Sequence, residues 1–160
     1  MTNEMKNALK VAAPEGLPFI DFEREFDAPV AAVFRAHRDP DLLRQWVGPS
    51  GYETEIESYD FRTGGTYRYV QTKGDERYAF RGVFHVVRDN EFAIQTFEFE
   101  AFPDVVSIES IAFEDLGGGR SRVRGHAVYP SMEARDGMVA GGMESGMSEG
   151  YERLDALLAG

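Results

Sequence analysis

Apolar and polar positions along the chain follow two different periods. In "IDFEREFD" (20–27), the apolar Ile20, Phe22 and Phe26 stand among charged residues, which predicts a half-buried strand. The following residues, 28–38, carry apolar side chains at helical spacing, and "RDPDLLRQWVGP" (38–49) predicts a second short helix. Asp39 supplies an N-cap for that second helix, and the dipeptide at 48–49 ends it.

The period changes to two after residue 51. Six alternating segments follow one another, from "YETEIESYDF" (52–61) to "RSRVRGHAVY" (120–129). Short turn sequences separate them, among them "KGDE" (73–76), "RDN" (88–90) and "DLGGG" (115–119). Strands joined by such short loops pair as antiparallel neighbours, so these segments predict a meander.

One long helix is expected after residue 131, although "GMVAGGMESGMSEGYERL" (137–154) contains many glycines. At 100° per residue, one face of this helix carries Met132, Asp136, Val139, Met143, Gly146, Met147, Gly150, Leu154 and Leu157. A single antiparallel sheet needs a cover on its apolar face, and this is the long element that remains. The expected fold class is therefore α+β, with the terminal helix lying across the sheet.

The glycines on that buried face have two readings. The missing side chains of Gly146 and Gly150 either let the helix lie close against the sheet or leave a void between helix and sheet. The flexible, polarizable Met143 and Met147 favour the void, since a core built for rigidity uses Leu or Ile. Gly137 and Gly141 fall on the outer face, where neither reading applies.

The length, cysteine count and net charge of the chain exclude several classes of function. The chain has 160 residues, no cysteine and a formal net charge of −11. One domain is expected over residues 19–160, after a flexible leader at 1–18. The acidic surface argues against nucleic acid and anionic membranes as partners. The absence of cysteine excludes disulfides and thiolate metal sites, and a cytoplasmic location fits it.

Catalytic and metal-binding patterns are not found in the sequence. His37, His85 and His126 form no close-spaced metal pair, and no motif implies a cofactor. His85 and His126 are expected at the surface, and His37 is expected in the core. Asp60 and Arg62 share a strand face and read as a structural pair beside a glycine turn.

Several segments together resemble the START-like (SRPBCC) superfamily, and within it a single-domain member of the activator of heat-shock protein 90 ATPase homologue-like family. The resemblance rests on "FDAPVAAVFRAHRDPDLLRQWVGP", "YDFRTGGTYRY", "FRGVFHVV", "IAFEDLGGGRSRV" and "GMESGMSEGYERLDALL". It implies a helix-grip fold: a curved antiparallel sheet of about seven strands that grips a long C-terminal helix. Two short helices stand between the first and second strands, and a ligand cavity lies between sheet and helix.

Three functions follow as hypotheses. The leading one is a protein that binds a small hydrophobic or amphipathic molecule, as a monomer or homodimer, and is not an enzyme. The alternatives are a stress-related or chaperone-contacting module and an enzyme of the polyketide cyclase/dehydratase type. Trp46 either gates the cavity or anchors its helix, and Asp136 either faces the ligand or stabilises its helix. The expected ligand-binding residues are Trp46, Tyr67, Tyr69, Tyr78, Phe80, Phe84, Phe97, Tyr129, Asp136, Met143 and Met147.

Overall fold

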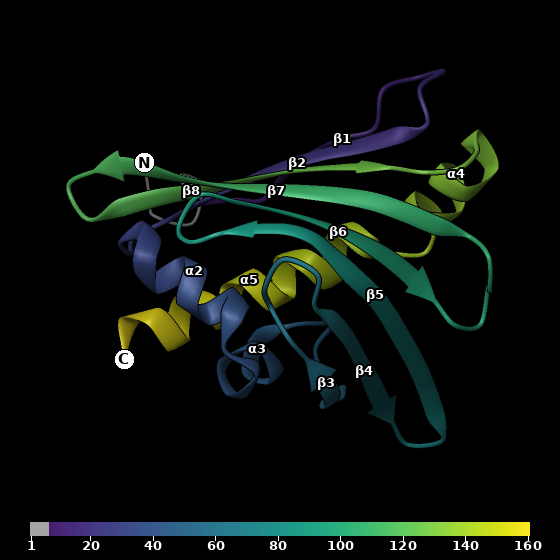
Figure 1. Cartoon of the computed structure of the whole chain (residues 1–160), viewed down its shortest axis with the longest axis horizontal. Coiled ribbons are helices and arrows are strands. Elements are labelled where there is room, and N and C mark those ends of the chain that lie inside the picture. Colours follow the sequence, from purple (N-terminus) through teal and green to yellow (C-terminus); the bar gives the residue numbers. More distant parts are fainter. Residues whose placement is uncertain (1–6) are drawn as a thin grey trace.

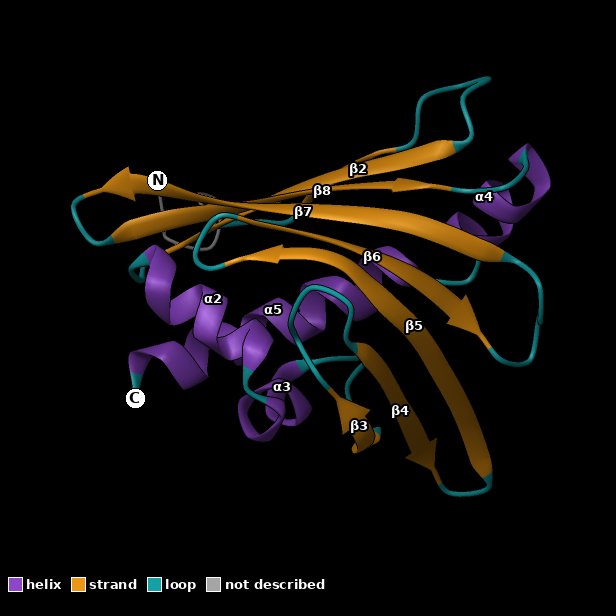
Figure 2. Ribbon diagram, in the orientation of Figure 1, coloured by secondary structure: helices purple, strands orange, loops and turns teal. Residues whose placement is uncertain are grey.

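Antiparallel strands form one curved sheet, and α2, α3 and α5 lie together on one side of it (Figures 1 and 2). The computed structural model describes residues 7–160. Its elements in chain order are β1 (Lys10–Ala12), β2 (Phe19–Phe26), α2 (Val30–Arg38), α3 (Pro40–Trp46), β3 (Glu53–Tyr59), β4 (Thr66–Lys73), β5 (Glu76–Arg88), β6 (Phe92–Phe99), β7 (Val106–Gly117), β8 (Arg120–Val128), α4 (Met132–Ala140) and α5 (Met143–Ala159). The strand order across the sheet is β1-β2-β8-β7-β6-β5-β4-β3. The predicted α+β helix-grip architecture, with its meander and two early helices, is confirmed.

The sheet has eight strands rather than about seven. The additional strand, β1, falls within the segment expected to be a flexible leader, and it pairs with β2 through Lys10 opposite Glu23 and Ala12 opposite Asp21. Three residues with little apolar alternation carry no strand signal by themselves. The expected leader also includes residues 1–6, which lie outside the described residues.

The expected single terminal helix is wrong, because the chain forms two helices that meet at a glycine pair. Gly141 caps the C-terminus of α4, and Gly142 has φ of 84°, a left-handed conformation that favours glycine. Gly142 is thereby explained, whereas Gly141 has φ of −76°, which any residue can adopt, and Gly137 has open space around it. Because of this break, the residues of α4 and α5 do not continue one helical face. Asp136 is 63% exposed instead of buried, and Arg135 beside it is enclosed.

The main core lies where α2, α3 and the C-terminal part of α5 meet the sheet. Its fully enclosed members include Phe26, Val33, Phe34 and Leu154, with Phe113 and Val123 from the sheet. A second, smaller cluster of Ile20, Ala127 and Tyr129 lies against Met138 and Met143. Together the two clusters cover β2, β7 and β8 more completely than β4 to β6.

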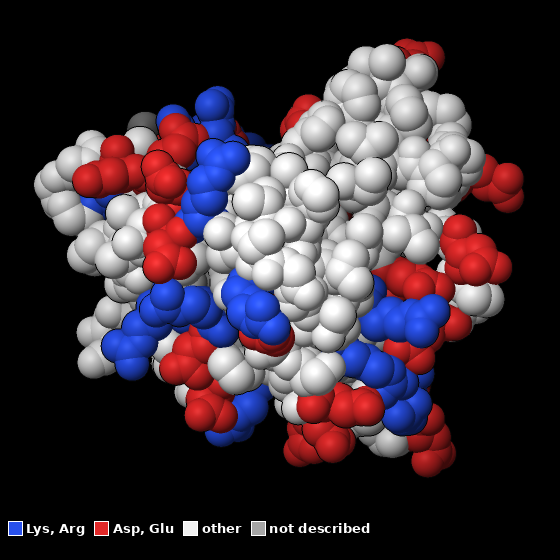
Figure 3. Space-filling view, viewed as in Figure 1, with Lys and Arg blue, Asp and Glu red and all other residues white. Residues whose placement is uncertain are grey.

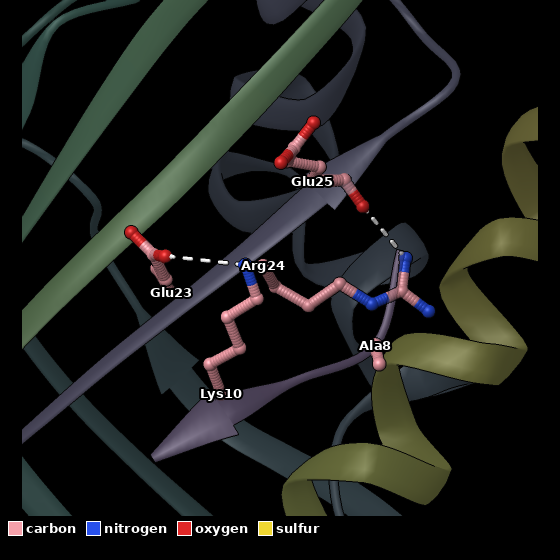
Figure 4. Close-up of a pocket in the computed structure, with 5 residues that line it drawn as sticks. All are labelled: Ala8, Lys10, Glu23, Arg24 and Glu25. Carbon is pink, nitrogen blue, oxygen red and sulfur yellow. Dashed lines mark hydrogen bonds and ion pairs between the residues drawn. The ribbon is translucent and has the colours of Figure 1, made fainter. Parts of the chain in front are cut away.

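Helix α5 is held by contacts at its C-terminal half. A Cβ on Gly150 would lie 2.9 Å from the backbone oxygen of Trp46, so this glycine permits close packing on the end of α3. Arg153 donates to the same oxygen at 3.0 Å. Arg24 of β2 extends toward α5 (Figure 4) and donates to Asp155 at 2.7 and 2.6 Å. The space-making role expected for Gly150 is therefore wrong.

Candidate functional site

Aromatic side chains from β4, β5 and β6 gather on the helix-facing side of the sheet, as the alternation predicts. The register places Tyr69 opposite Phe80, and Phe80 opposite Phe99. Ring centroids lie 5.2 Å apart between Tyr69 and Phe80, 5.4 Å between Phe80 and Phe97, and 5.3 Å between Phe80 and Phe99. We refer to these four residues, Tyr69, Phe80, Phe97 and Phe99, as the aromatic wall.

The aromatic wall differs in packing from the aromatic residues next to it. Tyr67 and Phe84 are 4% and 1% exposed and pack on one another at a centroid distance of 5.1 Å. All four wall residues, by contrast, keep part of their surface exposed. The wall is therefore an apolar surface that the packing of the protein leaves partly uncovered.

A carboxyl group lies beside this wall. Glu109 of β7 accepts a hydrogen bond from Gln95 Nε2 at 3.1 Å, and the Ser107 side chain also bonds to it. Gln95 Nε2 lies 3.4 Å from the Tyr67 hydroxyl, which donates to Thr96 O at 2.6 Å. Desolvation is the largest effect on Glu109 and raises the pKa of its carboxyl to about 7.

Glu109 is not among the ligand-binding residues predicted from the sequence. In the first half of β7, Ser107 and Glu109 face the helices, whereas Val106 and Ile108 face away from them. Alternation alone assigns the apolar pair to the interior, because apolar residues are normally buried. The sequence signal that could have located Glu109 is its position two and four residues before Ile111 and Phe113. Alternate residues of one strand lie on the same face of the sheet.

Three tyrosine hydroxyls on this side make no hydrogen bond to any residue in the described part of the chain. They belong to Tyr69, Tyr129 and Tyr151. None of the three oxygens is fully enclosed, so each keeps some contact with solvent. Burial and the nearby charge of Glu109 raise the pKa of all three, so they remain neutral. They can donate hydrogen bonds to a small molecule.

Other predicted site residues lie elsewhere. Trp46 is 6% exposed in the main core and donates from Nε1 to Ala36 O at 3.0 Å, so it anchors α3 rather than gating an opening. Tyr78 lies toward the edge of the sheet and donates to Glu76 at 3.0 Å. Asp136 accepts from Arg135 and points into solvent. Met143 and Met147 are half-buried against different core clusters.

The histidines and the charge pair lie apart from the aromatic wall. His37 is buried in the core as expected, with Nδ1 2.8 Å from Val33 O, whereas its Nε2 has no partner among residues 7–160. Burial lowers the pKa of His37 to about 4. His85 is exposed, and His126 pairs with Asp21 on the outer side of the sheet. Asp60 and Arg62 form an exposed pair at 2.7 Å, and no metal-binding group of acids and histidines occurs in the described part of the chain.

Two hollows in the molecular surface lie outside the space between the sheet and α5. The first lies between β1 and β2, where Lys10 pairs with Glu23 and the five side chains drawn in Figure 4 leave no room for a ligand. The second is a depression of about 560 Å³ on the outer side of the sheet, lined in part by Asp21, His126 and Phe92. Figure 3 shows an uncharged area over β5, β6 and β7, with acidic and basic side chains around it.

The curved antiparallel sheet and the helix across it define a START-like (SRPBCC) fold. The chain belongs to the family described as "Activator of Hsp90 ATPase homolog 1-like protein", whose model matches residues 27–159. No curated protein matches the chain. Among residues 7–160, no helix is long and apolar enough to cross a membrane.

Solved structures support the same assignment. A protein from Arthrobacter aurescens is 27% identical, with a TM-score of 0.84 over 94% of this chain and 91% of that chain. A protein from Mycobacterium smegmatis is 26% identical, with a TM-score of 0.84 over 93% and 95%. The AHSA1 protein from Silicibacter pomeroyi is 23% identical, with a TM-score of 0.71 over 88% and 97%, and shows the likeness in fold alone.

Proposed function

We propose that this protein binds a small hydrophobic or amphipathic molecule between the sheet and the helices α4 and α5. The observation that carries the proposal is the aromatic wall, whose four rings face the helices and keep part of their surface exposed. Aromatic surface left partly exposed on the inner side of a sheet costs free energy that burial under a ligand recovers, at about 25 cal/mol per Å². The tyrosine hydroxyls and Glu109 supply the few polar groups that small-molecule sites place in apolar surroundings.

A fluorescent probe tests this proposal. The neutral dye N-phenyl-1-naphthylamine brightens in apolar surroundings, and we expect it to bind the wild-type protein saturably. Phe80→Ser removes a ring at the centre of the wall and is expected to weaken binding about tenfold, from the loss of one buried phenyl contact. The matched control is Val83→Ser in the same strand, since Val83 is 47% exposed on the outer side.

The control decides where the dye binds. Circular dichroism first establishes that both variants are folded. Equal weakening by Phe80→Ser and Val83→Ser places the dye outside the wall and contradicts the proposal. Failure of the wild-type protein to bind the dye contradicts it as well.

Protein docking is a second candidate, favoured by an apolar row on the outer side of the sheet. Val128 lies opposite Ile108, Ile108 lies opposite Thr96, and Val83 donates its backbone N–H to the Thr96 hydroxyl. Val128, Ile108 and Val83 are 38%, 57% and 47% exposed. Contiguous exposed apolar surface marks interaction sites, and the family description suggests the chaperone heat-shock protein 90 as the partner.

An ATPase assay tests the docking candidate. Added protein is expected to stimulate the chaperone's ATPase, and Ile108→Glu is expected to abolish that stimulation by placing a charge in the row. Leu116→Glu is the control, because Leu116 is exposed near the far end of β7. Absence of stimulation by the wild-type protein removes this candidate.

A further inference from the structure

Glu109 has no positively charged partner in residues 7–160, whereas the buried Arg24 and Arg135 each pair with a carboxylate. Its hydrogen-bond partners are the neutral Gln95 and Ser107, and no arginine, lysine or histidine of residues 7–160 pairs with it. By contrast, Arg24 is bound to Asp155, and Arg135 is bound to Asp136. A half-buried carboxyl group without a counter-charge carries a desolvation cost, which makes it unusual as a purely structural group.

The groups around Glu109 also point inward without being used. Gln95 orients the carboxyl from β6, and Tyr69, Tyr129 and Tyr151 bring hydroxyls from β4, from the end of β8 and from α5. The charge of Glu109 contributes to the raised pKa of all three tyrosines, of which Tyr151 packs in the main core against Trp46. The aromatic wall adjoins Glu109, because Gln95 lies opposite Glu109 and Phe97 of the wall lies opposite Ser107 on the same pair of strands.

We propose that Glu109 is the head-group site for an amphipathic amine, whose ammonium pairs with the Glu109 carboxylate while its apolar body lies on the aromatic wall. This inference rests on the proposed function and names its ligand class. An ammonium donates hydrogen bonds to the carboxylate, and charge-assisted bonds of this kind are about twice as strong as neutral ones. It also supplies the counter-charge that the described residues do not provide.

Matched probes of one chain length test the inference. Decylamine, decanol and decanoate have the same apolar body and differ in the head group, and calorimetry below their micelle concentrations gives the affinities. We expect the wild-type protein to bind decylamine about tenfold more tightly than decanol, and decanoate more weakly than either. Glu109→Gln is expected to remove the preference for the amine and leave the affinity for decanol unchanged.

A charge-matched variant controls for the loss of one negative charge. Glu55→Gln changes an exposed glutamate on β3 and is expected to keep the preference for decylamine. If Glu55→Gln reduces the preference as much as Glu109→Gln does, the preference comes from the overall acidity of the protein and the inference is overturned.

A pH series on the wild-type protein provides a second measurement that needs no variant. Burial raises the pKa of Glu109 to about 7, and an alkylamine stays charged up to about pH 10. The preference for decylamine is therefore expected above pH 7 and is lost as the pH falls to 5.5, whereas the affinity for decanol stays constant.

Other titratable groups facing this space do not produce that profile. Tyr67, Tyr69, Tyr129 and Tyr151 have pKa values raised above the ordinary tyrosine value, so they stay neutral throughout the series. Arg24, which lies over the Tyr151 ring, remains bound to Asp155.

The outcomes separate the two proposals. Binding of decanol without any preference for decylamine overturns the inference and leaves the proposed function standing. A preference that survives Glu109→Gln also overturns the inference. If none of the three molecules binds, the proposed function fails and the inference fails with it.

Discussion

Two aromatic regions lie on the same side of the sheet and differ in what covers them. Around Phe34, two helices and the sheet converge, and Phe34 is 1% exposed with its ring 5.1 Å from Phe113 and 5.6 Å from Phe61. Around Phe80, the rings contact one another across β4, β5 and β6 but keep exposed surface. Aromatic content is similar in both places, so the arrangement of the helices separates core from candidate site.

The buried titratable group in each region differs in the same way. His37 lies in the closed region, where burial lowers its pKa to about 4 and keeps it neutral. Glu109 lies in the open region, where burial raises its pKa to about 7 beside unpartnered hydroxyls. Perturbed pKa values mark candidate functional groups, and of these two groups Glu109 is the one beside the partly exposed aromatic wall.

Truncating one ring in each region gives the largest expected contrast. Phe34→Ala should lower the free energy of unfolding by about 3–5 kcal/mol, because it leaves a cavity in the closed core. Phe80→Ala should cost about 1–2 kcal/mol, since part of that ring is already in contact with solvent. Urea unfolding measures both, and equal costs would show that the aromatic wall is ordinary core.

The pH dependence of stability tests the difference between the pKa shifts of Glu109 and His37. The pKa of Glu109 is about 7 in the folded protein against an ordinary 4.5, so the folded protein holds a proton that the unfolded chain releases between these values. This contribution to stability is present at low pH and is lost as the pH rises through that window. Relative to wild type, Glu109→Gln should therefore become more stable between pH 4.5 and 7, by up to about 3 kcal/mol.

His37 acts in the opposite direction over an overlapping range. Its pKa is about 4 in the folded protein against an ordinary 6.5, so its contribution is present above pH 6.5 and is lost as the pH falls toward 4. Urea unfolding at half-unit pH intervals measures both effects. A difference between Glu109→Gln and wild type that does not vary with pH would show that Glu109 titrates normally.

Two glycine substitutions give the smallest expected effects and test how α5 is held. Gly150→Ala should destabilise by about 1 kcal/mol or more, because the new Cβ meets the backbone at Trp46 and displaces α5 from α3. Gly137→Ala in α4 has open space and should stabilise by about 0.5–1 kcal/mol through helix propensity. Thermal unfolding compares them, and a stabilising Gly150→Ala would mean that α5 is not closely packed there.

Much of the fold follows from the order of residues. The change of period after residue 51 and the short turns predicted the meander, and the alternation placed Tyr69, Phe80 and Phe97 on one side of the sheet. These predictions succeed because strand and helix periods are properties of the local backbone, independent of distant contacts. The family resemblance rests on equally local segments and is confirmed.

Tertiary structure decided which of those residues are core and which are candidate site. Trp46 and Tyr69 are both aromatic residues that the sequence predicts to bind a ligand. In the structure, α5 packs over Trp46 through Gly150 and Arg153, whereas Tyr69 stays partly exposed. Glu109 faces inward because its register with Gln95 outweighs the apolar neighbours that alternation would bury. The exposure of a side chain depends on contacts between segments far apart in the chain, and no local pattern contains it.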